Sequence, residues 1–223
     1  MKNVSIVYYG FINPKIKWQN IIYGQLTQLK ETMICEVADI YIHLTGDQNN
    51  LSLAINGVKK IIPDSIISTS ITNQYEYPGI HLLWSLAKEN KEHIYLYFHS
   101  KGMSHMTNQR ALHERKIFKG VIESWKKVLN IFYTYPHINK IGLNASELGW
   151  MWFNFWWARG TYLSECEEPI ITERRHYYED WLYRKINGTM KSNVEECYSL
   201  SDDKEGIFYS PQQACEKLGL IKI

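Results

Sequence analysis

Hydrophobic and polar residues follow two different periods along the first hundred residues, and these periods alternate. Apolar runs that stop at glycine or polar residues predict strands over residues 4–9, 37–44, 65–71 and 93–99. Apolar positions three and four apart predict helices over 18–31 and, after an asparagine cap, over 51–61. Pro78 is expected to begin a further helix, because proline suits the first turn of a helix.

Such alternation is typical of an α/β fold with an open, mostly parallel sheet flanked by helices. In these sheets, ligands bind beyond the carboxyl ends of the strands. The second half is less regular: we expect a helix over 110–132 that Gly120 can interrupt, a strand over 140–144, an extended aromatic run over 150–158 and a helix over 176–186. We therefore expect one domain over 1–223, in which residues 1–105 form a nucleotide-binding half and residues 106–223 complete the site.

Composition narrows the class of protein. The chain is 45% hydrophobic and 22% charged, which suits a sizeable core, and its net charge of +2 comes from scattered residues that predict no nucleic-acid partner. No apolar run reaches membrane-spanning length, and no signal-peptide pattern opens the sequence. The four widely spaced cysteines predict free thiols and a cytoplasmic protein. Nothing in the pattern indicates an oligomeric state.

Several common site motifs are missing from the sequence. There is no Walker P-loop and no GxGxxG, which disfavours P-loop ATPases, kinases and typical NAD enzymes. There is no HExxH and no GxSxG, which disfavours metalloproteases and serine hydrolases. No DxD-like aspartate pair ends the fourth predicted strand.

The segment from His99 to Gly102 interrupts the fourth apolar run at its carboxyl end. Lys101 offers a compact positive charge, His99 a hydrogen-bond donor, and Gly102 lets backbone N–H groups approach phosphate oxygens. A turn with solvated polar residues is the alternative. The position at a carboxyl end favours diphosphate binding.

The aromatic run contains more tryptophan than a strand needs. Strand alternation would send Trp156 and Trp157 to opposite faces, so that one packs in the core and the other stacks on a sugar ring. The alternative is that both tryptophans are core residues.

The expected helix from Arg174 onwards carries cations and carboxylates. Arg175 and Glu179 are four residues apart and share a face, as do His176 and Asp180. One carboxylate could deprotonate an acceptor hydroxyl while an arginine meets a phosphate. An ordinary surface helix with ion pairs is the alternative.

Three stretches together resemble the small GT-A-type glycosyltransferases of bacterial surface-polysaccharide gene clusters and large algal viruses. The marks of that family are a Phe-His-Thr-Lys-Gly segment after the fourth strand, an Asn-Phe-Trp-Trp-Ala segment and an Arg-x-x-x-Glu-x-Trp helix. They stand here in the same order at residues 98–102, 154–158 and 175–181. Ser100 replaces the usual threonine, and Phe153 stands where a glycine commonly precedes the asparagine. The resemblance covers about residues 4–186, and the tail after Gly188 matches nothing.

The resemblance implies a GT-A-like fold and transfer of a hexose or deoxyhexose from a nucleotide-sugar, most simply a UDP-sugar, to a glycan hydroxyl. Residues 106–223 would then hold sugar and acceptor. The implied roles are base and ribose binding by Tyr8, Tyr9, Gly10, Thr72 and Tyr77, diphosphate binding by His99, Lys101 and Gly102, and sugar or acceptor binding by Asn154, Trp156, Trp157, Arg175 and His176.

The implied catalysis rests on charge. Lys101 would stabilise the leaving diphosphate and partly replace a metal ion, although Mn²⁺ or Mg²⁺ can also take part. Glu179 or Asp180 would be the base if the reaction inverts the anomeric configuration; a retaining reaction needs no base in this role. Two other functions stay open: a sugar- or nucleotide-binding module without turnover, and a nucleotidyltransferase, which would need an acidic metal pair that the sequence does not show.

Overall fold

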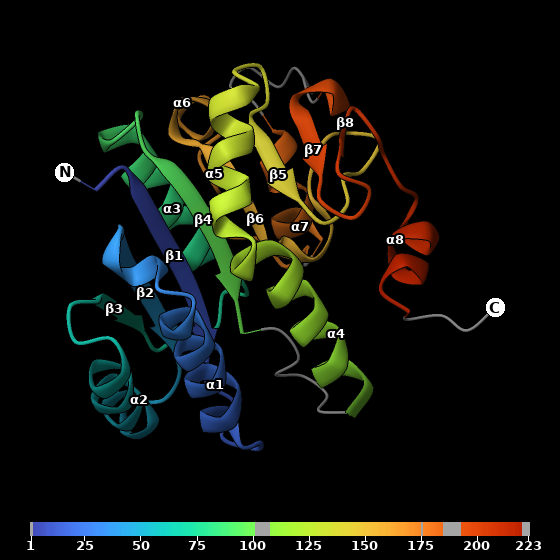
Figure 1. Ribbon diagram of the computed structural model, residues 1–223. Helices are drawn as coiled ribbons and strands as arrows, with labels where there is room; N and C mark the ends of the chain where they lie inside the picture. The colour runs from blue at the N-terminus through green and yellow to red at the C-terminus, as the bar shows by residue number, and fades with distance from the viewer. Residues whose placement is uncertain (1, 101–107, 175, 185–192, 220–223) are drawn as a thin grey trace.

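The computed structural model describes residues 2–100, 108–174, 176–184 and 193–219, and within them one sheet runs through the molecule (Figure 1). Its strands stand in the order β3-β2-β1-β4-β6-β5-β7-β8. Their bounds are β1 Val4–Phe11, β2 Ala38–Thr45, β3 Ile66–Ser70, β4 Ile94–His99, β5 Lys140–Gly142, β6 Trp156–Arg159, β7 Cys197–Ser199 and β8 Lys204–Glu205.

The sheet is mixed and mostly parallel. Strands β3, β2, β1 and β4 are mutually parallel, β6 runs antiparallel to both β4 and β5, and β5 pairs in parallel with β7. The short β8 runs antiparallel to β7. Because β6 alone is reversed between β4 and β5, the carboxyl ends of β1 to β5 and β7 lie at one edge, and β6 begins there. The expected fold class, a mixed, mostly parallel sheet flanked by helices, is confirmed.

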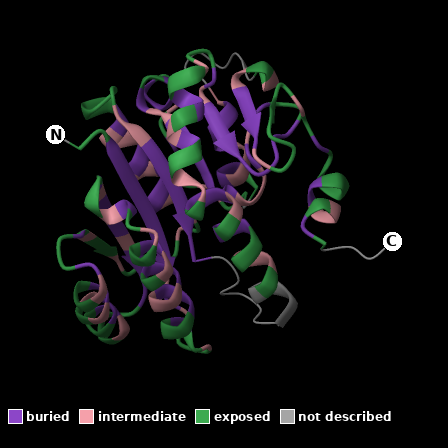
Figure 2. Cartoon of the chain, viewed as in Figure 1, coloured by how far each residue is buried: buried purple, intermediate pink, exposed green. Residues whose placement is uncertain are grey.

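Helices cover both faces of the sheet and bury most of its inner strands, whereas β3 and β8 at its two ends are largely exposed (Figure 2). One face packs against α1 (Trp18–Glu31), α2 (Gln48–Ile61), α4 (Asn108–Phe118) and α5 (Trp125–Thr134). The other packs against α3 (Tyr77–Glu89), α6 (Gly160–Ser164) and α7 (Tyr177–Asp180). Alternation along β1 divides its side chains in this way: Tyr8 joins the α1 face and Tyr9 the α3 face.

Several predicted boundaries are confirmed to within one residue, and others are wrong for local reasons. The second helix begins at Gln48 rather than residue 51, because the Asp47 carboxylate accepts the Asn50 N–H (3.0 Å) and caps it. The expected break at Gly120 is confirmed: a π-helical turn, Lys119–Glu123, separates α4 from α5.

Of the helix expected over 176–186, residues 185 and 186 lie outside the described residues. Within 176–184, α7 is followed by a 3₁₀ turn, Trp181–Tyr183, so the α-helix ends earlier than predicted. Arg184 then takes an extended conformation, and its carbonyl accepts the N–H of Glu167 (3.0 Å). That backbone contact ends the helical segment.

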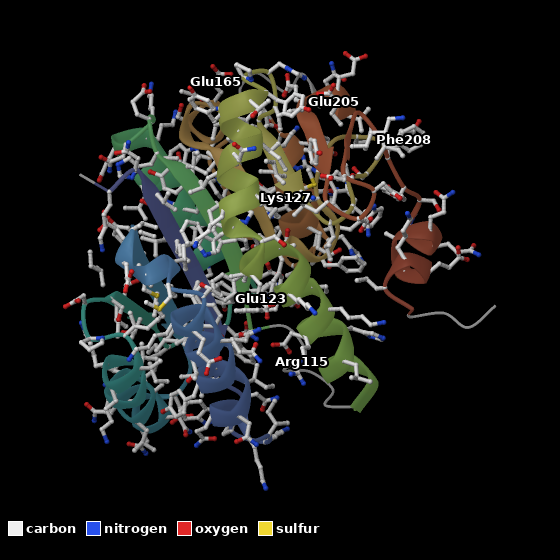
Figure 3. The ribbon with its side chains drawn as sticks, in the orientation of Figure 1. Arg115, Glu123, Lys127, Glu165, Glu205 and Phe208 are labelled. Carbon is white, nitrogen blue, oxygen red and sulfur yellow. The ribbon has the colours of Figure 1, made fainter. Side chains whose placement is uncertain are left out.

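The tail, which matches no part of the resembling family, extends the sheet. Residues 193–219 supply a 3₁₀ turn (Val194–Glu196), β7, β8 and α8 (Pro211–Lys217). Lys127, on α5, pairs with Asp203 at 2.7 Å, and Lys116 donates to the Leu218 carbonyl (2.7 Å). Figure 3 shows Lys127 on α5, Glu205 in β8, and Phe208 in the segment that follows β8. Strands from both halves of the chain thus share one sheet; the proposed division at residue 105 lies outside the described residues.

Candidate functional site

Buried polar side chains gather at the carboxyl edge of the sheet. His99 ends β4, Asn154 precedes the reversed strand β6, and Asn144 follows β5. Since β4, β6 and β5 are neighbours in the sheet, these three residues lie at the same edge. Asn144 and Asn154 are fully or almost fully buried, and His99 is 9% exposed. Buried polar groups are costly in a core, so a concentration of them at a ligand-binding edge marks a candidate site.

Glu76 is the centre of this group. It lies just before α3, so the first turn of that helix brings its carboxylate over the sheet edge. One oxygen lies 3.5 Å from His99 Nδ1, and the other accepts hydrogen bonds from Asn154 Nδ2 (2.8 Å) and the Tyr97 hydroxyl (3.3 Å). The Glu76 side chain is only 18% exposed. One carboxylate therefore orients an imidazole, an amide and a phenol at once.

Tyrosine hydroxyls around Glu76 remain protonated at neutral pH. Burial raises the pKa of Tyr97 well above its usual value, and the negative charge of Glu76 raises it further. Burial likewise raises the pKa of Tyr9, which lies beside Tyr97 on the same face. The Tyr97 phenol donates its hydrogen bond to the Glu76 carboxylate, and the buried Tyr9 phenol keeps its proton.

An unusual backbone places Asn154. Phe153 and Asn154 both have positive φ, 76° and 53°, within the 3₁₀ turn Trp152–Asn154. Asparagine tolerates this conformation, whereas for phenylalanine it costs roughly 1–3 kcal/mol. Glycine would adopt it freely. The turn also explains why the aromatic run is not extended throughout: the strand begins only at Trp156.

The side chain of Asn154 makes three contacts. Besides donating to Glu76, its Nδ2 donates to the Tyr178 carbonyl (3.0 Å), and its Oδ1 accepts from the Trp156 indole (3.2 Å). Asn154 thereby joins the start of α3, the start of β6 and α7. The first two motif segments, which contain His99 and Asn154, are brought together through Glu76.

Neither tryptophan of the motif is available to a ligand. Trp156 packs in the α3-side core and Trp157 in the α1-side core, and each is fully buried. Their indole N–H groups donate to Asn154 Oδ1 and to the Val121 carbonyl (2.9 Å). The opposite facing is confirmed, but the prediction that one of them stacks on a sugar is wrong. β6 is an interior strand covered on both faces, so alternation exposes neither side.

We expect Trp156→Ala and Trp157→Ala to lose stability alike, each by about 3–5 kcal/mol, because each removes a fully buried indole. Urea unfolding of both variants measures this loss. Tyr133→Ala, at a tyrosine that is 88% exposed on α5, is the control and should change little. A tryptophan variant as stable as the parent protein would contradict the assignment of that residue to the core.

The residues predicted to bind nucleotide divide between the two faces. The Tyr8 hydroxyl is buried on the α1 face and donates to Gln25 (2.6 Å), so the Tyr8 side chain is not available to a nucleotide. Gly10 faces the same way; a Cβ there would lie 2.7 Å from Leu44 Cδ2, so it is needed for packing. Tyr9, the exposed Thr72 and the half-buried Tyr77 lie on the α3 face or in the segment that leads to α3.

Ser100 has a structural role that the motif alone does not reveal. Its N–H donates to the Tyr9 carbonyl, and its hydroxyl accepts the Phe11 N–H, each at 2.8 Å. A serine or a threonine can supply this hydroxyl, which extends the pairing of β4 with β1 beyond His99. Lys101 and Gly102 lie outside the described residues.

The carboxylates of α7 have different surroundings. Asp180 is held between two guanidinium groups: it pairs with Arg174 and, at 3.1 Å, with Arg184. Glu179 lies 3.9 Å from the imidazole of the largely exposed His176, and its own side chain is 28% exposed. His176 and Asp180 are four apart in a helical turn, as expected, but the imidazole pairs with Glu179. Arg175 lies outside the described residues.

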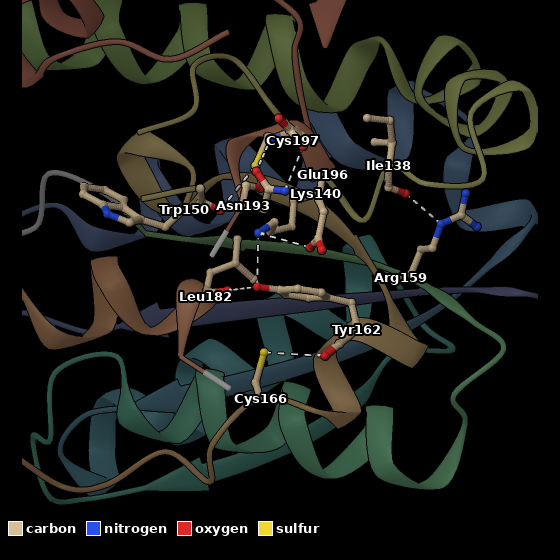
Figure 4. A network of polar contacts seen from close by, with 12 residues as sticks. Ile138, Lys140, Trp150, Arg159, Tyr162, Cys166, Leu182, Asn193, Glu196 and Cys197 are labelled. Carbon is tan, nitrogen blue, oxygen red and sulfur yellow. Dashed lines mark hydrogen bonds and ion pairs between the residues drawn. The ribbon is translucent and has the colours of Figure 1, made fainter. Parts of the chain in front are cut away.

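A second buried polar network lies at the opposite edge, where β5 begins (Figure 4). The fully buried Lys140 ammonium donates to the Tyr162 hydroxyl (3.1 Å) and lies 3.9 Å from the Glu196 carboxylate. Burial raises the pKa of the neighbouring Cys197 thiol to about 11, so it stays protonated. Tyr162 in turn donates to the Leu182 carbonyl (2.7 Å). These contacts connect β5, α6 and β7 and lie away from the carboxyl edge.

All four cysteines are free thiols, as expected.

Within the residues that the structure describes, no cluster of three or more histidine, cysteine, aspartate or glutamate side chains could hold a metal ion. Among the helices of the same ranges, none is both long and apolar enough to cross a membrane.

The sequence interpretation missed Glu76, Tyr97 and Asn144. Glu76 lies inside the 72–77 segment that was assigned to nucleotide binding, and its position just before Tyr77-Pro78 was the available signal. Tyr97 looked like an ordinary strand residue. Asn144 is the last residue of a predicted strand. Its Nδ2 and Oδ1 are both buried without a hydrogen-bond partner in the described part of the chain. A sequence cannot show this burial.

Comparison with known proteins gives the family of the chain. Residues 7–198 match the model of a family described as Domain of unknown function (DUF8361), and the chain belongs to that family. No curated protein matches. Among solved structures, the chain is similar to the mannosyltransferase PcManGT from Pyrobaculum calidifontis in complex with GDP-Man and Mn²⁺, at 7% identity and a TM-score of 0.44. The similarity covers 78% of this chain and 50% of that one, so this chain spans about half the length of that protein.

Proposed function

We propose that this protein is a nucleotide-sugar-dependent glycosyltransferase of the GT-A type, which moves a hexose or deoxyhexose to a hydroxyl group of a glycan. The observation that carries the proposal is the meeting of His99 and Asn154, from two motif segments 55 residues apart, on the carboxylate of Glu76. This meeting takes place at the sheet edge where α/β folds bind ligands.

The nucleotide would lie along the carboxyl ends of β1 and β4 on the α3 face. Tyr9 and the segment from Thr72 to Tyr77 border this position, and the diphosphate would reach His99 and the following Lys101 and Gly102. The carboxylate of Glu76 is close enough to stabilise a positive charge on the His99 imidazole. UDP is the nucleotide that the proposal favours, in a cytoplasmic enzyme.

The chemical step would depend on charge at the leaving group. As the bond between sugar and phosphate breaks, negative charge grows on the diphosphate. Positive charge on Lys101, and on His99 when its imidazole is protonated, would stabilise that charge more in the transition state than in the ground state. In an inverting reaction, Glu179 would take the proton of the acceptor hydroxyl, because Asp180 is already held by two arginines.

A titration tests the proposal directly. We expect saturable binding of at least one of UDP, GDP and TDP, and slow hydrolysis of the matching nucleotide-sugar when no acceptor is present. Isothermal calorimetry with and without Mn²⁺ measures the binding, and release of free sugar measures the hydrolysis. Binding without any hydrolysis or transfer would instead support a binding module, and no binding under either condition would refute the proposal.

A further inference from the structure

Tyr75 combines an exposed aromatic ring with a backbone conformation that tyrosine rarely adopts. Its φ is 54°, in the left-handed region, where a bulky residue is a genuine outlier. Its side chain is nevertheless 43% exposed, so burial of the ring does not explain why tyrosine stands there. Asparagine or glycine would suit the backbone better. Strain of this kind persists where the surroundings hold it and collects at binding sites.

The surroundings of Tyr75 hold it in place. Its N–H donates to the Asn73 side chain (3.1 Å), and a β-bridge joins Gln74 to Glu76. Its ring lies against that of Tyr178, with centroids 6.5 Å apart and planes 32° from parallel. Tyr178 is itself fixed, because its hydroxyl accepts the Thr172 N–H (3.1 Å). The backbone of Tyr75 is therefore held on both sides, and its exposed ring has Tyr178 as a neighbour.

The contact with Tyr178 also indicates which part of the site the ring serves. Tyr178 lies on α7, and its carbonyl accepts from Asn154, so Tyr75 faces the side of the site where β6 and α7 meet. The next residue in the chain is Glu76, at the centre of the buried group. A ring in this position stands beside the sugar side of the site rather than beside β2 and β3.

From these contacts we infer that Tyr75 is the platform on which a pyranose ring of the substrate stacks, the role that Trp156 and Trp157 cannot fill. The inference rests on the proposed function for the identity of the substrate. Aromatic side chains bind the apolar face of a sugar through this kind of contact. The pyranose belongs either to the nucleotide-sugar donor or to the acceptor glycan.

The test uses two variants with different consequences. Tyr75→Asn suits the left-handed backbone and removes the ring, so we expect the melting temperature to stay the same or rise. Its affinity for the nucleotide-sugar, or its KM for the acceptor, should worsen about 3- to 10-fold, while affinity for the bare nucleoside diphosphate stays unchanged. Tyr75→Phe keeps the ring and should behave like the parent protein. Tyr133→Asn makes the same change at an exposed tyrosine on α5 and is the control.

The assays separate the alternatives. A loss confined to the nucleotide-sugar assigns the ring to the donor, and a loss confined to the acceptor assigns it to the glycan; both support the inference. An equal loss for the bare nucleoside diphosphate would mean that the ring stacks on the base, and unchanged affinities would mean that it binds no substrate. Either result overturns the inference.

A measurement without nucleotide keeps the inference distinct from the proposed function. Saturation-transfer NMR with methyl hexopyranosides and short oligosaccharides should show sugar contacts in the parent protein that weaken in Tyr75→Asn. If no nucleoside diphosphate binds, the proposed function fails. The NMR result then decides by itself whether Tyr75 contacts a sugar. A parent protein that contacts no sugar in either assay would refute the inference.

Discussion

Replacing Glu76 by glutamine should lower the rate of sugar transfer by about 10²- to 10³-fold, the effect of losing one preorganised electrostatic group. Glutamine has nearly the same shape, but one carboxylate oxygen becomes an amide that donates hydrogen bonds. Both oxygens of Glu76 face donors or a cation: one faces His99, and the other accepts from Asn154 and Tyr97. The new amide would oppose a donor on one side, and the charge beside the imidazole would be lost.

If Glu76 positions other residues, nucleotide binding and sugar transfer should respond differently to its replacement. Affinity for the bare nucleoside diphosphate should change less than transfer does, because Glu76 acts through His99 and Asn154. Glu89→Gln is the matched control: it makes the same change at the exposed, far end of the same helix. If both variants transfer sugar at the parent rate, Glu76 does not organise the reaction. If Glu76→Gln only lowers the melting temperature, its role is structural.

The fold was predictable because its signals are local. Period-two and period-3.6 patterns gave the first four strands and the helices between them, since these elements bury one face or both in a regular way. Side-chain caps moved the boundaries by a few residues, as Asp47 did for α2. The tail strands β7 and β8 are only three and two residues long, too short for a period to show.

The site was predictable only in part because its centre depends on contacts between distant segments. His99 was found because a histidine after an apolar run is conspicuous. Glu76 was missed because its position before Tyr77-Pro78 marks the start of a helix but does not show that α3 brings the carboxylate over the end of β4. Alternation correctly separated Trp156 from Trp157. It could not show that β6 is an interior strand with both faces covered, which is a property of the whole sheet.

The two neighbouring carboxylates of α7 should respond differently to neutralisation. Asp180→Asn should lower stability, because its carboxylate bonds to Arg184 through two nitrogens, at 3.2 and 3.1 Å, and also to Arg174. Because hydrogen bonds to charged groups are lost, we expect the free energy of unfolding to fall by about 1–2 kcal/mol. The bond to the exposed Arg174 accounts for the smaller part. Transfer by the folded protein should remain near the parent rate.

Glu179→Gln should have the opposite profile. If Glu179 takes the proton from the acceptor hydroxyl, transfer should fall by about 10²- to 10⁴-fold while thermal stability and donor affinity are retained. Its long, 3.9 Å contact with the exposed His176 contributes little to stability. Hydrolysis of the donor by water, compared with transfer to the acceptor, separates base catalysis from donor binding. A Glu179→Gln variant with normal transfer would remove the base from the mechanism and favour a retaining reaction. Equal losses of stability in both variants would instead assign both carboxylates to the ion-pair network of α7.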